Sequence, residues 1–263
     1  MTTIAASQVK ELRDRTGAGM MECKRALEET SGDVDAAIQL LRERGVAQAG
    51  KRAGRETTEG KVGYHIADDH ATMVAVGCET EPVSNNDEFL TFARRVLDVV
   101  DGGGPQAVEP LEDDRVALIA RLGENILVRG ATRMERDGKV IAGYTHAPLN
   151  KIGVLVKGTG PEEAVRRVAV HIAAARPRYL SREDVPEDEV SAERAIYEKQ
   201  PDVQSKPETV REKIVEGMLG KRFFAESVLE NQPWVYEPGK SVGQVLREDG
   251  VEIVDFVRYD VGE

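Results

Sequence analysis

The spacing of apolar residues changes once along this 263-residue chain, close to residue 60, and that change limits the possible folds. Residues 1–46 carry their apolar side chains at helical spacing, whereas runs of strand-forming residues alternate with helical segments from residue 61 onward. The small, charged and glycine-rich stretch 47–60 separates the two patterns. We therefore predict a helical unit, a linker that can be helical at its start, and an α+β body.

Capping residues divide the first 46 residues into three short helices. Ser7 can cap the first helix and Gly17 ends it, while Gly19 precedes the second. Asp33 opens the third helix and Gly45 closes it. Three helices of this length can bury only a thin core of their own.

Strand, turn and helix signals alternate through the rest of the chain. Two predicted strands flank a turn at Asp68-Asp69. Two more flank Asp137-Gly138, a dipeptide that favours a tight β-hairpin. Residues 162–175 show the spacing of an amphipathic helix, and we predict that it packs on the sheet.

The order of the predicted elements indicates two similar halves. We predict core subdomain N at 61–140 and core subdomain C at 141–263. Two charged helical segments, 185–199 and 207–219, enclose a proline-bearing turn. They predict a helical hairpin, inserted at about 182–222, that projects from the body.

Charge and cysteine content exclude several classes of protein. A net charge of −11 repels phosphates, so we expect no direct binding of nucleic acid. Lys and Arg gather only at 42–55, which we assign to a linker or a protein contact. Cys23 and Cys78 each stand alone, so we expect two buried free thiols and no zinc site. No stretch approaches the ~20 apolar residues of a membrane span, so we expect a soluble, cytoplasmic protein without a membrane partner.

The sequence contains no recognisable set of catalytic residues. The stretch 45–52, "GVAQAGKR", nearly fits a phosphate-binding loop, but it follows a helix and Arg52 replaces the hydroxyl that would meet magnesium. The histidines lack metal-ligand spacing, and no nucleophile stands beside a base. His146, in "GYTHAPLNK", stands where a strand gives way to a loop, and a purely structural role is the alternative to a functional one. We expect no enzyme activity, no cofactor and no metal.

The stretch 77–89, "GCETEPVSNNDEF", leaves a predicted strand through an acidic and rigid corner. Asp87 opens a helix directly after it. Glu79 and Glu81 alternate on an extended segment, which predicts that they share a face. Pro82 stiffens the corner because its ring fixes φ near −65°. A solvated strand end is the structural alternative to a functional site.

Several longer motifs are specific enough to compare with known families. They are "VKELRDRTGAGMMECKRALEETSGDVDAAIQLLRERG", "HIAAARPRYL", "SKPETVREKIVEGMLGKRFF", "NQPWVYEPGKSVGQVL" and "FVRYDVG". Together they resemble the elongation factor Ts family over nearly the whole chain. The resemblance implies that residues 1–46 form a ubiquitin-associated-like three-helix module.

The resemblance also implies a function that residue spacing does not show. Members of the family bind elongation factor Tu, in GDP-bound and nucleotide-free forms, and promote GDP release by displacing Mg²⁺. The chain would then be a guanine nucleotide exchange factor in translation elongation that makes and breaks no bond. Two alternatives stay open: a duplicate that binds the GTPase without exchange, and an adaptor that uses the N-terminal helical module.

The family's wedge for Mg²⁺ displacement is a corner that commonly reads Thr-Asp-Phe-Val. The matching residues here are Thr80, Glu81, Pro82 and Val83. Glu81 keeps the charge of the usual Asp with one more methylene of reach. Pro82 departs from the usual Phe and offers less apolar area.

Further positions match family residues that contact or approach the partner. Arg13, Met20 and Met21 match contacts made by the N-terminal module, and His146 matches a histidine near the partner. Neighbouring helical residues point ~100° apart, so burial of both methionines in a thin core is the less favourable alternative. Some members continue past the position of Glu263 into a C-terminal helical module, which we expect to be absent here. Two complexes can also pair into a dimer of heterodimers.

Overall fold

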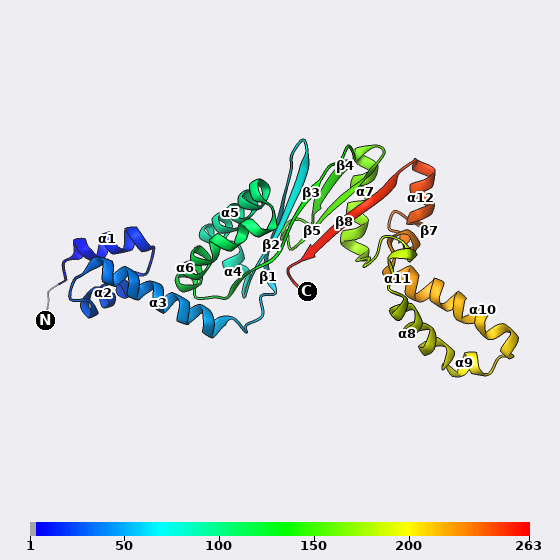
Figure 1. The fold of residues 1–263 in the computed structure, drawn as a ribbon, viewed down its shortest axis with the longest axis horizontal. Helices are drawn as coiled ribbons and strands as arrows, with labels where there is room; N and C mark the ends of the chain where they lie inside the picture. The colour runs from blue at the N-terminus through cyan, green and yellow to red at the C-terminus, as the bar shows by residue number, and fades with distance from the viewer. Residues whose placement is uncertain (1–3) are drawn as a thin grey trace.

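Three helices form a small unit at one end of the molecule (Figure 1). The computed structural model describes residues 4–263, so the first three residues of the predicted module lie outside it. The helices are α1 (Ala6–Thr16), α2 (Met20–Glu29) and α3 (Val34–Arg52). Their shared core consists of Val9, Leu12, Cys23, Ala26, Leu27 and Ala37.

Local signals set most of the ends of these three helices. Gly17 ends α1 with φ at 68°, the left-handed conformation that glycine adopts without strain. Asp33 caps α3 by accepting a hydrogen bond from the Ala36 N–H. The prediction that Ser7 caps α1 is wrong, because the helix already begins at Ala6.

Helix α3 is longer than its sequence indicated. Gly45, predicted to end it, lies in its interior, so that prediction is wrong. Helix α6 (Glu112–Leu122) packs across α3 at this point. A β-carbon on Gly45 would lie 3.5 Å from Val116 and 3.6 Å from Ala120, so the two helices are in close contact. This packing supports the helix into the stretch predicted as a linker, and α3 ends at Arg52.

Strand β2 (His70–Cys78) is the middle strand of the first sheet, and all its residues are buried. It pairs antiparallel with β1 (Glu59–Ile66) and β3 (Ile126–Glu135). Val74 and Val76 pack in the cluster beneath α6 and α5 (Asp87–Gly103). Met73 and Ala75 belong to the apolar layer on the opposite face. Cover on both faces explains why residues 73–78 of β2 form a continuous apolar run.

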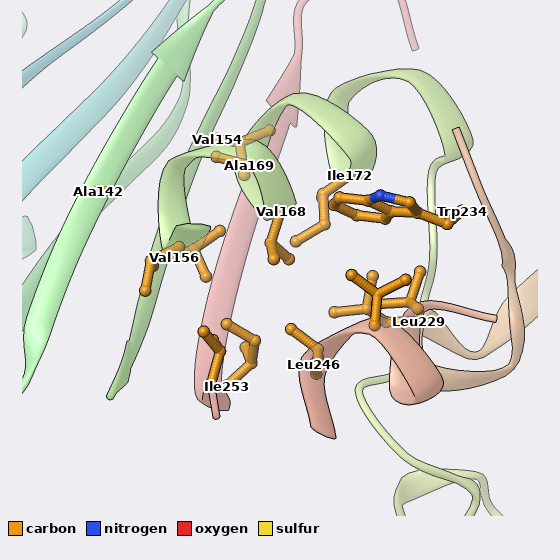
Figure 2. Packing of buried hydrophobic residues seen from close by; sticks show 14 of the residues in the cluster. Ala142, Val154, Val156, Val168, Ala169, Ile172, Leu229, Trp234, Leu246 and Ile253 are labelled. Atoms are coloured by element: carbon orange, nitrogen blue, oxygen red, sulfur yellow. The ribbon is translucent and has the colours of Figure 1, made fainter. Parts of the chain in front are cut away.

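The second sheet has the order β4-β5-β8 and stacks on the first. Its strands are β4 (Val140–Thr145), β5 (Ile152–Thr159) and β8 (Glu252–Asp260). Helices α7 (Glu162–Ala175), at the predicted position, and α12 (Val242–Asp249) cover its outer face. Figure 2 shows Trp234 close to Ile172 and Leu229 in this core. The predicted α+β class, with helices preceding a sheet-containing core, is confirmed.

The turn at Asp137-Gly138 links the two sheets. Both residues have positive φ, at 50° and 72°. The predicted hairpin is wrong, because β3 pairs with β2 whereas β4 pairs with β5. The dipeptide signals the backbone of the turn but does not decide which strands pair. Met134 before the turn and Ile141 after it both enter the apolar layer between the sheets, one from each side.

Two helices project from the second half of the molecule (Figure 1). Helices α8 (Glu187–Glu198) and α10 (Glu208–Met218) lie where the sequence predicted them, and α9 (Pro201–Gln204) joins them. They have a small apolar cluster of their own, with Tyr197, Val203, Val215 and Leu219 buried. The other short elements are α4 (Glu81–Ser84), η1 (Pro105–Leu111), η2 (Arg182–Asp184), η3 (Leu219–Phe224), α11 (Ala225–Ser227), η4 (Leu229–Asn231), β6 (Pro233–Trp234) and β7 (Glu237–Ser241). Within residues 4–263, every helix is too short or too polar to cross a membrane.

Two histidines, His65 near the end of β1 and His70 at the start of β2, both contact Asp101 near the end of α5. His65 Nδ1 and His70 Nε2 each lie 3.1 Å from the same oxygen of Asp101, and His70 Nδ1 lies 2.6 Å from Asp69. The hydrogen bond to Asp69 raises the pKa of His70, burial lowers it, and Asp101 raises it again. The Arg133 guanidinium also lowers the pKa, but the net shift is upward. The charged imidazolium is therefore favoured in the folded state.

We expect Gly45→Ala and Gly45→Leu to change stability in opposite directions. A single methyl group fits the contact with α6, so Gly45→Ala should raise the free energy of unfolding by about 0.5–1 kcal/mol through helix propensity. A leucine side chain would force the helices apart and cost about 1–3 kcal/mol. Urea titration of both variants tests this, and equal effects would contradict the close packing of α3 on α6.

We also expect His70 to make the stability of the chain depend on pH. Because the folded pKa lies above 6.5, the contribution is complete below that pH and is lost as pH rises through the folded value. The free energy of unfolding should therefore fall as pH rises above about 6.5 in the native chain, and less so in His70→Gln. Urea titrations at a series of pH values measure the slope, and identical slopes would contradict the assignment.

Candidate functional site

The predicted corner lies between the end of β2 and the start of α5. Thr80 has an extended backbone and precedes the single helical turn of α4. Glu81 and Pro82 are exposed in this turn, where proline's missing N–H leaves no helical hydrogen bond unmade. Val83 is half-buried and packs against the cluster beneath α5. The corner therefore presents Glu81 and Pro82 outward and anchors itself through Val83.

A single carboxylate holds the backbone of the corner. One oxygen of Glu124 accepts from the N–H groups of Glu79 and Thr80, at 3.1 and 3.0 Å. Its other oxygen accepts from the Thr80 hydroxyl at 2.5 Å. Within the turn, the Ser84 hydroxyl donates to the Glu81 carbonyl at 2.8 Å. Three hydrogen bonds to Glu124 thus fix the entry to the corner, and a fourth lies within the turn itself.

Glu79 points away from the exposed tip and into a polar contact with α3. Its oxygens lie 3.2 Å from Arg52 and 3.0 Å from Arg55, and one of them accepts the Asn125 N–H at 2.6 Å. The prediction that Glu79 and Glu81 share an extended face is wrong, because α4 begins at Glu81. Burial raises the pKa of Glu79, but the Asn125 N–H and the two guanidinium groups outweigh it, so the net pKa falls below its ordinary value. Glu79 is therefore a fixed anion.

Both cysteines are buried free thiols, as predicted. Cys78 lies immediately before the corner and donates to the Thr80 carbonyl at 3.3 Å. Burial, and next the charge of Glu124, raises the pKa of Cys78 to about 12. A thiol with this pKa stays protonated and acts as an apolar packing group, not as a nucleophile.

The loop that follows β4 lies across a hollow from the corner. A hollow of about 370 Å³ is lined by Asn85 and Leu90 on the corner side and by Pro148 on the loop side. His146 is exposed in the same loop, and its Nδ1 lies 2.9 Å from the Tyr144 hydroxyl. His146 lines a different hollow, also of about 370 Å³. The fold brings the loop towards the corner, with His146 on its other side.

The predicted contact residues of the N-terminal module are on its surface. Arg13 is exposed on α1, and Met20 and Met21 are 47% and 65% exposed at the start of α2. The alternative in which both methionines pack inside the module is therefore wrong. In Figure 1 the module lies far from the helical hairpin, at the opposite end of the molecule.

The anchors of the corner could not be found from the sequence. Glu124 and Asn125 lie about 45 residues beyond the corner, and no motif connects them to it. Arg52 and Arg55 belong to the basic stretch 42–55, for which the sequence predicts only a linker or a protein contact. In the part of the chain that the structure describes, no three His, Cys, Asp or Glu residues gather in a way that could hold a metal ion.

Comparison with known proteins places these features in a family. Residues 79–263 match the family model described as "Elongation factor TS". The chain is 43% identical over 264 residues to "Elongation factor Ts" of Shewanella amazonensis, covering 99% of this chain and 91% of that protein. It is 44% identical over 275 residues to the protein of that name from Thioalkalivibrio sulfidiphilus, with 99% and 93% coverage. It is 43% identical over 264 residues to the Vibrio vulnificus protein, with 99% and 92% coverage. The chain belongs to the elongation factor Ts family.

Proposed function

We propose that this chain is the guanine nucleotide exchange factor for elongation factor Tu. It binds the GDP-bound and nucleotide-free forms of that GTPase in the cytoplasm and promotes GDP release, so that GTP can bind during translation elongation. Support comes from the family match, which covers residues 79–263, and from relatives named elongation factor Ts that align over 99% of the chain. The chain acts by binding alone and makes or breaks no bond.

Thermodynamic linkage sets what such a factor must do. A factor that weakens nucleotide binding must bind the nucleotide-loaded GTPase more weakly by the same ratio. Each tenfold change requires about 1.4 kcal/mol of differential binding. Magnesium bridges the phosphates of a bound nucleotide to protein oxygens, so displacing the groups that position the ion removes a major anchor of GDP.

The rigid, exposed tip formed by Glu81 and Pro82 is the observation that carries this proposal. Both side chains face solvent at the end of a fully buried strand, and Glu124 fixes the backbone on which they stand. Because the tip is ordered before it binds, little conformational entropy is lost on docking. Glu81 and Pro82 then enter the partner's magnesium site, with Val83 supporting them from beneath.

Pro82 also supports one alternative function, binding of the GTPase without exchange. A phenylalanine at this position could bury enough surface to contribute about 1.5–3 kcal/mol, and proline offers less apolar area. A chain that binds the GTPase without accelerating exchange is therefore the second candidate. The adaptor alternative is disfavoured, because the family match lies beyond the N-terminal module.

The other predicted residues complete the proposed interface. Exposed methionines adapt to a partner's shape, so Met20 and Met21 suit a docking surface, with Arg13 adding charge. His146 takes part from the exposed loop beside the corner. Pairing of two such complexes through their cores into a dimer of heterodimers belongs to the same proposal.

We expect the double variant Glu81→Ala/Pro82→Ala to lower the maximal rate of GDP release at least about tenfold, which corresponds to about 1.4 kcal/mol in the activation free energy of release. The measurement is stopped-flow release of a fluorescent GDP analogue from the cognate elongation factor Tu at saturating factor. Release as fast as with the native chain would eliminate the proposed tip.

The chain offers a matched control in a second exposed Glu-Pro pair. Glu237→Ala/Pro238→Ala makes the same chemical change at the start of β7, next to Tyr236 and distant in sequence from the corner. This variant should accelerate release like the native chain. If the native chain binds the GTPase without accelerating release, the second candidate function holds instead.

A further inference from the structure

One largely buried carboxylate, that of Glu79, joins helix α3 of the N-terminal module to the corner. Arg52 is the last residue of α3, and its guanidinium lies 3.2 Å from Glu79. Arg55, just beyond the helix, lies 3.0 Å from the other oxygen of Glu79. The side chains of Glu79 and Arg52 are only 16% and 22% exposed. Glu79 is the immediate neighbour of Thr80, where the corner begins.

Helix α3 is built to carry the module as a rigid arm. It runs for 19 residues without interruption, from Val34 beside α2 to Arg52 beside the corner. Gly45 brings its middle into contact with α6, and Ala49 joins the core beneath the first sheet. A continuous helix held at its middle and at its end transmits the orientation of the module to the core.

Further hydrogen bonds hold the polar contact between Glu79 and the end of α3. Asn125 donates its N–H to Glu79 at 2.6 Å and its side-chain N–H₂ to the Arg55 carbonyl at 2.8 Å. The backbone N–H of Glu79 itself is held by Glu124 at 3.1 Å. Loss of the negative charge at Glu79 would leave Arg52 largely buried without its carboxylate, which favours detachment of the arm.

We propose that Glu79 is a positioning residue that couples the N-terminal module to the Glu81–Pro82 tip. Through it, the surface around Met20 and Met21 and the tip approach the partner as one rigid body. This inference rests on the proposed exchange function, because it assigns the two surfaces to one partner. Binding of the partner at the N-terminal module then positions the tip, and this positioning is lost if the tip moves independently of the module.

The first test needs no partner protein. Spin labels on Lys10→Cys and Asp98→Cys, both at exposed positions, report the distance between α1 and α5, while the two native cysteines stay buried. Adding Glu79→Gln should broaden the distance distribution measured by pulsed electron paramagnetic resonance. Asp113→Asn is the matched control, because it removes the Arg42–Asp113 ion pair between α3 and α6 and does not touch the corner. The control should leave the distribution narrow.

The second test measures exchange. Glu79→Gln should lower the maximal rate of GDP release about tenfold while changing the half-saturating factor concentration much less, since the contact surfaces themselves are intact. Arg52→Ala/Arg55→Ala removes the cationic partners of Glu79 and should also lower the maximal rate of GDP release. Combining it with Glu79→Gln should add little, because all three residues act through one interaction. Additive losses would overturn the coupling.

The outcomes separate this inference from the proposed function. An unchanged distance distribution in both Glu79→Gln and Arg52→Ala/Arg55→Ala overturns the coupling. If the distance distribution broadens but the rate of GDP release does not change, the coupling plays no part in exchange and the proposal is overturned. The assignment of the tip is tested separately by Glu81→Ala/Pro82→Ala. If the native chain fails to accelerate GDP release, the exchange function fails, and with it the role of Glu79 in exchange.

Discussion

Apolar packing between the two sheets is the interaction on which the rest of the structure depends. It covers the second face of β2, whose first face is already covered by helices, so the strand is buried along its whole length. Packing on both faces fixes the position of the end of this strand, and the chain leaves the sheet after Cys78. The acidic corner therefore emerges from a strand that is buried along its whole length.

Charged groups then determine which way the corner faces. Glu124 and Glu79 are acids within a strongly acidic chain, yet each accepts from three donors. Glu81 and Pro82, which follow in the corner, lie exposed on the surface. This division of acids into anchoring and exposed groups gives a tip whose backbone is held by hydrogen bonds and ion pairs.

Sequence signals that act over a few residues predicted their structures well, and signals that needed a distant partner did not. Gly17 and Asp87 marked a helix end and a helix start, because caps are local. Gly45 was misread because its role depends on α6, more than 60 residues away. The turn at Asp137-Gly138 was predicted, but strand pairing follows from burial that the dipeptide cannot encode. The exposure of the tip was predictable from composition, whereas its anchor Glu124 was not.

The dependence of GDP release on magnesium tests the central claim most directly. If the tip acts by displacing the ion, the native chain should accelerate release strongly when Mg²⁺ saturates the partner. The acceleration should shrink when a chelator has removed the ion, because GDP has then already lost that anchor. An equal acceleration with and without Mg²⁺ would contradict the account.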